Sequence, residues 1–240
     1  MNADHTVRSF DEDLKVLAKA VLRMGGLAEA QLANAVQALV RRDSELAGRV
    51  VAGDTRIDAL EQEINDHAVR LLALRQPMAD DLRSIVGALK ISADLERIGD
   101  YASNVGKRVL VLNSLPPARP VSSIPRMSRL VQDILNDTLD AYGERDLDKA
   151  VEAWSRDEEV DDLYTALFRE LVTYMMEDAR NISACSHLLF IAKNIERIGD
   201  HTTNVAENIH FLVSGVPLRS TRPKGGGQGE YGDTLKGIVS

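Results

Sequence analysis

The sequence predicts an all-α protein made of two tandem, internally duplicated three-helix bundles, followed by a flexible C-terminal tail. Apolar residues recur at helical spacing through most of the 240 residues. Aromatic residues make up only 4 % of the chain and hydrophobic residues 44 %, so the core must be built mainly from aliphatic side chains, as in closely packed helices. One five-residue motif also occurs twice, at positions 96–100 and 196–200, which indicates an internal duplication.

The first bundle is expected over residues 1–113 as three amphipathic helices of roughly 30 residues each. Asp43 is a candidate N-cap of the second helix, and the prolines at 77 and 116–117 are expected to separate or end helices. The predicted inward-facing residues are Phe10, Leu14, Leu17, Val21 and Met24, then Leu46, Val50, Ile57, Leu60, Ile64 and Leu71, then Ile91, Leu95, Ile98, Ala102, Val105 and Val109.

The second bundle is expected over residues 124–213, because the motifs of the first one recur there. Glu-Arg-Ile-Gly-Asp occupies 96–100 and 196–200, with Asn-Val following each copy. Asp-x-x-(Ile/Val)-Asp occupies 54–58 and 157–161. Residues 114–123, which contain three prolines, are the predicted linker. The glycine-rich segment 214–240 is predicted to be a flexible tail, and an inert end is favoured over an interaction arm.

The composition excludes several classes of protein. A formal net charge of −8 argues against a nucleic-acid binder, which needs a basic face. A single cysteine excludes an internal disulfide framework and a cysteine-based zinc site. No apolar run reaches the roughly 18 residues that cross a membrane, so we expect a cytoplasmic protein that meets the membrane only through partners. No phosphate-binding loop or nucleophile motif is present, and we expect no enzymatic activity.

Acidic residues form a repeated pattern on the predicted helices. Glu96, Asp100 and Asn104 are spaced i, i+4, i+8 on the side of the third helix opposite its apolar stripe, and Asp54 and Asp58 lie on the flank of the second helix. Such oxygen ligands suit Mg, Mn, Fe or Zn cations near the surface. Outward carboxylates also fit an ordinary solvated helix face, and the pattern alone leaves both interpretations open. The second copy repeats the pattern with Asp157, Asp161, Glu196, Asp200 and Asn204.

Together with the segment Gln-Pro-Met-Ala-Asp-Asp-Leu-Arg at 76–83, these motifs resemble the PhoU family of phosphate transport system accessory proteins over residues 8–213. The resemblance implies a negative regulator of the bacterial phosphate starvation response. Its partners would be the ATPase subunit of the phosphate ABC transporter and a sensor histidine kinase, and we expect a homodimer. The second copy departs from the first at residues 179–182, where Ala-Arg-Asn-Ile replaces the proline-containing connection, so the two bundles need not be equivalent.

The resemblance also implies bound metal. Some family members hold iron or zinc clusters through (Glu/Asp)-x-x-x-Asp motifs, with Mg and Mn kept here as alternatives. Carried over by position, the ligands are Asp54, Asp58, Glu96 and Asp100, then Asp157, Asp161, Glu196 and Asp200.

Two other classes of function remain. One is a purely structural helical adaptor without metal. The other is a di-metal carboxylate enzyme, for which Glu207 and His210 form a Glu-x-x-His motif. The first copy has Lys107 and Leu110 at those positions, so the second motif that such an enzyme needs is missing.

Overall fold

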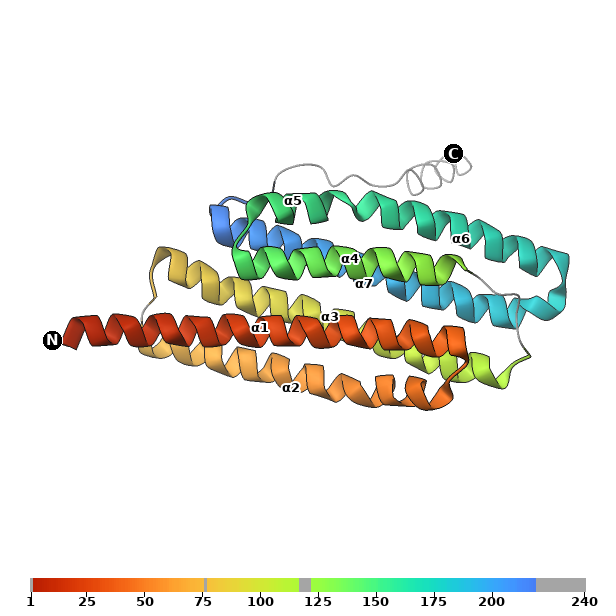
Figure 1. Ribbon diagram of the computed structural model, residues 1–240, viewed down its shortest axis with the longest axis horizontal. Coiled ribbons are helices and arrows are strands. Elements are labelled where there is room, and N and C mark those ends of the chain that lie inside the picture. Colours follow the sequence, from red (N-terminus) through yellow and green to blue (C-terminus); the bar gives the residue numbers. More distant parts are fainter. Residues whose placement is uncertain (1, 76, 117–121, 219–240) are drawn as a thin grey trace, which may run out of the picture.

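The computed structural model describes residues 2–75, 77–116 and 122–218, and these residues fold into α-helices joined by short connections (Figure 1). The predicted tail therefore falls almost entirely outside the described residues, as does half of the predicted linker. The helices are α1 (Asn2–Arg41), α2 (Ser44–Arg75), α3 (Ala79–Ser114), α4 (Ser123–Glu144), α5 (Leu147–Ser155), α6 (Asp157–Glu177) and α7 (Ile182–Ser214), with a short 3₁₀ helix η1 (Ala179–Asn181) before α7.

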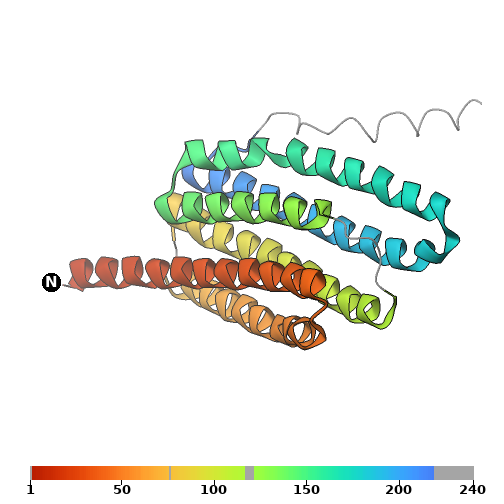
Figure 2. The ribbon, with the colours of Figure 1, turned by 45° about the vertical axis from the view of Figure 1, so that its right-hand side comes forward.

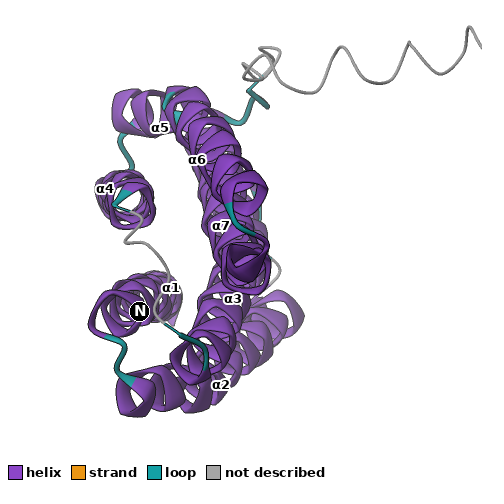
Figure 3. Cartoon of the chain, turned by 90° about the vertical axis from the view of Figure 1, so that its right-hand side faces the viewer, coloured by secondary structure: helices purple, strands orange, loops and turns teal. Residues whose placement is uncertain are grey.

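The helices form the two predicted three-helix bundles. The first bundle contains α1, α2 and α3, and the second contains α4, the pair α5 and α6, and α7. Viewed along the helices, α3 and α7 lie side by side, with α2 on one flank and α6 on the other, while α1 and α4 cover them on one side (Figure 3). The all-α prediction is confirmed, and no strand occurs in the described part of the chain.

The core is built from the apolar stripes that the sequence predicts. All six predicted inward-facing residues of α3, from Ile91 to Val109, are fully buried, and so are their counterparts on α7, from Ile191 to Ile209. Leu17, Val21 and Met24 on α1 are buried as well, while Phe10 and Leu14 are partly buried against the core. Asp43 caps α2 as predicted, because its Oδ1 accepts a hydrogen bond from the backbone N–H of Leu46 at 2.8 Å.

The second bundle does not repeat the helix lengths of the first. Its second helix is divided at Arg156 into α5 and α6, and α4 has only 22 residues against 40 in α1. The first turn of α6 contains Asp157, Glu158 and Glu159, and acidic side chains stabilise a helix N-terminus through its dipole. Asp146 caps α5 by accepting from the N–H groups of Asp148 and Lys149, as Asp43 caps α2.

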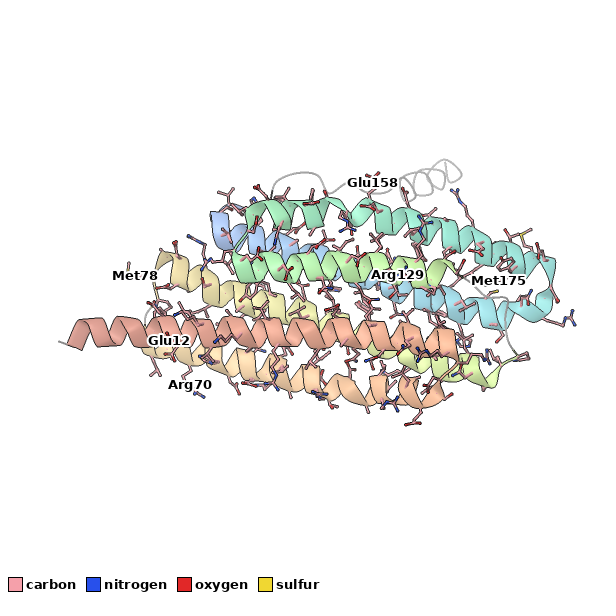
Figure 4. The ribbon with its side chains drawn as sticks, viewed as in Figure 1. Glu12, Arg70, Met78, Arg129, Glu158 and Met175 are labelled. Atoms are coloured by element: carbon pink, nitrogen blue, oxygen red, sulfur yellow. The ribbon has the colours of Figure 1, made fainter. Side chains whose placement is uncertain are left out.

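The two bundles pack through α3 and α7, which run antiparallel (Figure 2). Near one end the Lys90 ammonium lies 5.8 Å from the Phe211 ring centre, and near the other the Arg108 guanidinium lies 4.5 Å from that of Phe190. Met78, which follows α2, and Met175, near the end of α6, consequently lie at opposite ends of the molecule (Figure 4). Among the described helices, none combines the length and the apolar composition needed to cross a membrane.

Candidate functional site

The first acidic cluster (Asp54, Asp58, Glu96 and Asp100) lies where α2 packs against α3. The two helices approach closely there because α3 has a glycine at position 99. A Cβ atom added to Gly99 would lie 2.8 Å from Cδ1 of Ile57 and 3.5 Å from Oδ1 of Asp54. Close helix packing therefore explains this mid-helix glycine, and it brings the carboxylates of two helices onto one seam.

Asp54 is the best enclosed carboxylate of this cluster. Its Oδ1 accepts a hydrogen bond of 3.3 Å from Nε2 of Gln31, a buried amide on α1 that also lies within bonding distance of the carbonyls of Val50 and Gly99. Burial raises the pKa of Asp54 above its ordinary value, and the neighbouring carboxylates of Asp100 and Asp58 raise it further. Asp54 thus carries a charge that its surroundings disfavour.

Glu96 and Asp100 complete the cluster from α3. Burial raises the pKa of Glu96, and the Asp100 carboxylate adds to the rise, while the Arg97 guanidinium opposes it. Arg97 lies 3.6 Å from Glu96 Oε2 and 3.3 Å from Asp100 Oδ2 and is 59 % exposed, so both ion pairs are largely solvated. The side chains of Glu96 and Asp100 are 23 % and 40 % exposed, which fits the prediction of a site near the surface.

The second acidic cluster (Asp157, Asp161, Glu196 and Asp200) lies at the matching seam between α6 and α7. Glu196 was expected to point outward, and this expectation is wrong, because Glu196 is buried with only 7 % of its surface exposed. Asp157, expected on the flank of its helix, is buried as well, with 6 % exposed. Burial is the main cause of the raised pKa of Glu196, with further rises from Asp200 and Asp161 and opposition from Lys193. The cluster is deeper than a helical wheel of the second bundle alone indicates.

Individual oxygens of the second cluster differ in their contacts. Glu196 Oε1 forms an ion pair of 2.5 Å with Nζ of Lys193, whereas Glu196 Oε2 is buried and has no hydrogen-bond partner among the described residues. Asp157 Oδ1 accepts a hydrogen bond of 3.0 Å from the hydroxyl of Thr203. A buried carboxylate oxygen without a partner costs stability, which makes Glu196 Oε2 the atom best placed to gain from a cation.

The neutral and cationic residues around the carboxylates could not be found from the repeated acidic pattern. The position equivalent to Lys193 in the first copy is Ala93, and the position equivalent to Gln31 in the second copy is Ile134. Because neither polar residue is repeated in the duplication, no sequence pattern indicated them. Thr203 and its counterpart Ser103 are different, because both copies have a buried hydroxyl residue at this position between the Asp and Asn of the repeated motif. From this shared hydroxyl residue, a buried partner of the carboxylates could have been predicted in both copies.

The donor set fits a hard cation in chemistry. Each cluster offers carboxylate oxygens from two helices. Burial is the main cause of the raised pKa values of Asp54, Glu96 and Glu196, and neighbouring carboxylates add to the rise. In the described part of the chain, however, no group of three or more His, Cys, Asp or Glu side chains is arranged to hold a metal ion. Binding therefore requires rotamer changes, most of all at Glu196, whose ion pair with Lys193 would have to open.

The structure does not bring the Glu-x-x-His motif of α7 together as a metal site. Glu207 Oε1 accepts a hydrogen bond of 2.9 Å from the indole N–H of Trp154 on α5. His210 Nδ1 lies 3.0 Å from the carbonyl oxygen of Val216, just beyond the end of α7. Each side chain of this motif is thus engaged with a group outside it.

Comparison with known proteins agrees with this architecture. The family model named PhoU domain matches residues 21–109 and again 124–209. A Phosphate-specific transport system accessory protein PhoU homolog of Caulobacter vibrioides is 58 % identical over 222 residues, covering 92 % of this chain and 96 % of the relative. The protein of the same name from Rhizobium meliloti is 48 % identical, covering 93 % and 95 %.

Solved structures show the same likeness. The crystal structure of PhoU from Pseudomonas aeruginosa matches with a TM-score of 0.82 at 41 % identity, covering 86 % of this chain and 100 % of that one. The phosphate transport system regulatory protein PhoU from Streptococcus pneumoniae matches with a TM-score of 0.81 at 29 % identity, covering 88 % and 100 %. One domain model matches both bundles, and relatives are similar to this chain along nearly their whole length. This chain therefore belongs to the PhoU family.

Proposed function

We propose that the chain is a regulatory accessory protein of phosphate uptake that holds the bacterial phosphate starvation response off when phosphate is plentiful. The observation that carries the proposal is the near full-length similarity to proteins named as phosphate-specific transport system accessory proteins, at 58 % and 48 % identity. The solved relative from Streptococcus pneumoniae is described as a regulatory protein of phosphate transport, which supports the same role. In this proposal the chain is an adaptor and catalyses no reaction.

The adaptor would couple the ATPase subunit of the phosphate ABC transporter to the cytoplasmic region of a sensor histidine kinase. It would act in the cytoplasm as a homodimer and reach the membrane only through these partners. Size-exclusion chromatography of the purified chain with each purified partner tests this coupling. We expect a complex with each, and failure to bind either partner at micromolar concentration would contradict the proposal.

We further propose that the two acidic clusters bind metal ions, with iron or zinc as the first candidates and Mg or Mn as alternatives. Asp54, Asp58, Glu96 and Asp100 would hold one site, and Asp157, Asp161, Glu196 and Asp200 the other. A bound cation would neutralise carboxylates that crowd one another across each helix seam. The unpartnered Glu196 Oε2 and the raised pKa values of Asp54, Glu96 and Glu196 support this proposal.

Replacing the four more accessible carboxylates by alanine separates metal binding from folding. The variant Asp58→Ala, Asp100→Ala, Asp161→Ala, Asp200→Ala leaves the buried Asp157 and Glu196 in place. We expect it to lose metal in elemental analysis and to keep its helical circular dichroism. A control with Asp66→Ala and Asp140→Ala, two exposed residues away from the seams, should keep its metal. Metal content equal to that of the wild type in the fourfold variant would contradict the proposed ligands.

One observation favours the alternative of an adaptor without metal. Arg97 already bridges Glu96 and Asp100, and Lys193 already pairs with Glu196, so each cluster has a cation of its own. If this alternative holds, the wild-type chain purifies without metal, and the fourfold variant binds its partners as well as the wild type does.

A further inference from the structure

The internal duplication gives each surface of the first bundle an equivalent surface on the second. One such pair of surfaces differs in its side chains and in its charge. The surface concerned is the α1–α2 groove, an open cavity of about 250 Å³ between the first two helices. Its apolar floor is formed by Leu27, Leu46 and Val50, and the side chains of Arg49 and Arg56 stand at its α2 edge. No acidic-cluster residue lines the groove, although Gln31, which does line it, donates a hydrogen bond to Asp54 of the first cluster.

Gly53 keeps this groove open. It is the residue of α2 midway between the two arginines, and a Cβ atom added there would meet only Oε1 of Gln31, at 3.9 Å. Unlike Gly99, Gly53 is therefore not required by close helix packing. The free volume above it is accessible from outside, because Ala30 and Asn34 on the α1 side are short and exposed.

The equivalent position of the second bundle carries a long, paired side chain. At the offset of 103 residues, Arg156 replaces Gly53 and Asp137 replaces Asn34. The Arg156 guanidinium reaches across from α5 and α6 to α4, where it lies 2.9 Å from Oδ2 of Asp137, and it also lies 3.5 Å from Oε1 of Glu159. The second bundle thus has an arginine held between carboxylates at the position where the first bundle has only a glycine.

The charges of the two grooves are opposite as well. Arg49 and Arg56 correspond to Glu152 and Glu159, so each edge arginine of the first groove is a glutamate in the second. In a chain with a net charge of −8, a groove whose charged residues are two arginines is a local exception. Charge complementarity therefore indicates an acidic occupant for the first groove.

The spacing of the arginines indicates the shape of that occupant. Arg49 and Arg56 are seven residues apart on one helix, which corresponds to about 10 Å along its axis and to the same face. A second helix lying along the groove presents matching carboxylates when its acidic residues are also seven apart, with a small apolar residue between them above Gly53. Such docking of an amphipathic helix is a known mode of peptide recognition.

We propose that the α1–α2 groove docks an acidic helical segment of a partner protein, with Arg49 and Arg56 binding two carboxylates spaced two helical turns apart. Arg49 now pairs with Glu45 at 2.5 Å, and both side chains are more than half exposed, so this pair can exchange for an incoming carboxylate at little cost. The proposal does not rest on phosphate regulation or on metal binding, because its carboxylate-binding residues, Arg49 and Arg56, belong to neither acidic cluster.

Selection from a phage-displayed library of random 16-residue peptides on the full chain tests the proposal. Binders to the Gly53→Arg variant are removed beforehand, since this change places an arginine where the second bundle has Arg156. We expect the recovered peptides to carry two Asp or Glu residues seven apart around a small residue. Recovery of peptides without this pattern, or of none that distinguish the two proteins, would overturn the proposal.

Fluorescence anisotropy of the recovered peptides then measures the contribution of each groove residue. We expect Gly53→Arg, and separately the pair Arg49→Gln with Arg56→Gln, to raise the Kd at least tenfold. The arginine pair leaves the groove open, so it decides the outcome if the arginine at position 53 disturbs folding. The matched changes in the second groove, Glu152→Gln with Glu159→Gln, should leave the Kd unchanged, and an equal loss in both grooves would refute a specific site.

Discussion

Replacing Glu196 by glutamine should stabilise the metal-free protein at neutral pH, which is the opposite of what loss of an ion pair ordinarily does. The ion pair with Lys193 is partly exposed on the lysine side and is worth at most about 1 kcal/mol. The buried Oε2 atom has no partner, and an unsatisfied buried polar group costs about 1–3 kcal/mol, and more when it is charged. The neutral amide of glutamine at the same place removes the additional cost of the charge. We therefore expect a net gain of about 1 kcal/mol, or a Tm higher by about 2–4 °C for a chain of this size.

The stability difference between the two proteins should also depend on pH, in a direction that follows from the raised pKa of Glu196. Because burial raises the pKa of Glu196, the folded state binds its proton more tightly than the unfolded state does. The free energy of unfolding of the wild type consequently falls as the pH rises from the ordinary glutamate pKa, about 4.3, through the raised pKa of the folded state. Above that raised pKa the loss has reached its full size. The glutamine variant lacks this titration, so its advantage should be present at pH 7 and vanish near pH 4.

Urea denaturation of chelator-treated protein at both pH values measures the effect. Glu63→Gln is the matched control, since Glu63 is exposed in the middle of α2 and should change stability by less than about 0.5 kcal/mol. With metal added back, the order should reverse, because the wild type gains binding energy that the variant lacks. A metal-free Glu196→Gln variant less stable than the wild type at pH 7 would contradict this prediction.

Two further predictions concern the packing that holds the clusters in place. Gly99→Ala should destabilise the fold by about 1–3 kcal/mol, because the new methyl group would overlap Ile57. Gly48→Ala, where a Cβ atom meets nothing within 4 Å, should instead stabilise the fold by up to about 1 kcal/mol. Thermal unfolding compares the two variants, and equal effects would contradict this prediction. Asp94→Ala should lower the free energy of unfolding by about 1–3 kcal/mol, because the Asp94 carboxylate joins the two bundles. It lies 2.9 Å from Nδ1 of His201 and within reach of two asparagine amides. Urea denaturation measures the effect, and an unchanged midpoint would show that the contact contributes nothing.

The fold follows from the sequence because helical periodicity and duplication are local signals. The stripe from Ile91 to Val109 needs no knowledge of the partner helices to be recognised as inward-facing, and the repeat at 196–200 extends the same inference to α7. Asp43 as a cap and the prolines as helix ends act over a few residues in the same way. The break at Arg156 was missed, although the acidic run that follows it is a helix-start signal.

The environment of the site could be predicted only in part, because it depends on contacts between helices. A helical wheel of α7 correctly places Glu196 away from the stripe of its own bundle. It cannot show that α6 covers that side, or that α3 of the other bundle packs on the neighbouring face. Asp94 and His201 are likewise 107 residues apart, and only the antiparallel packing of α3 and α7 brings them within 2.9 Å. Duplication reveals which residues recur, but not how deeply each copy is buried.

A phosphate starvation reporter in cells tests the regulatory account most directly. Alkaline phosphatase activity would be measured at high phosphate in the host with this gene and any second copy deleted, and again with this chain restored. The account predicts that deletion switches the reporter on and that the restored chain switches it off, with partial or lost repression when Asp100 and Asp200 are both replaced by asparagine. A reporter that stays silent after deletion, or stays on when the wild-type chain is restored, would contradict it.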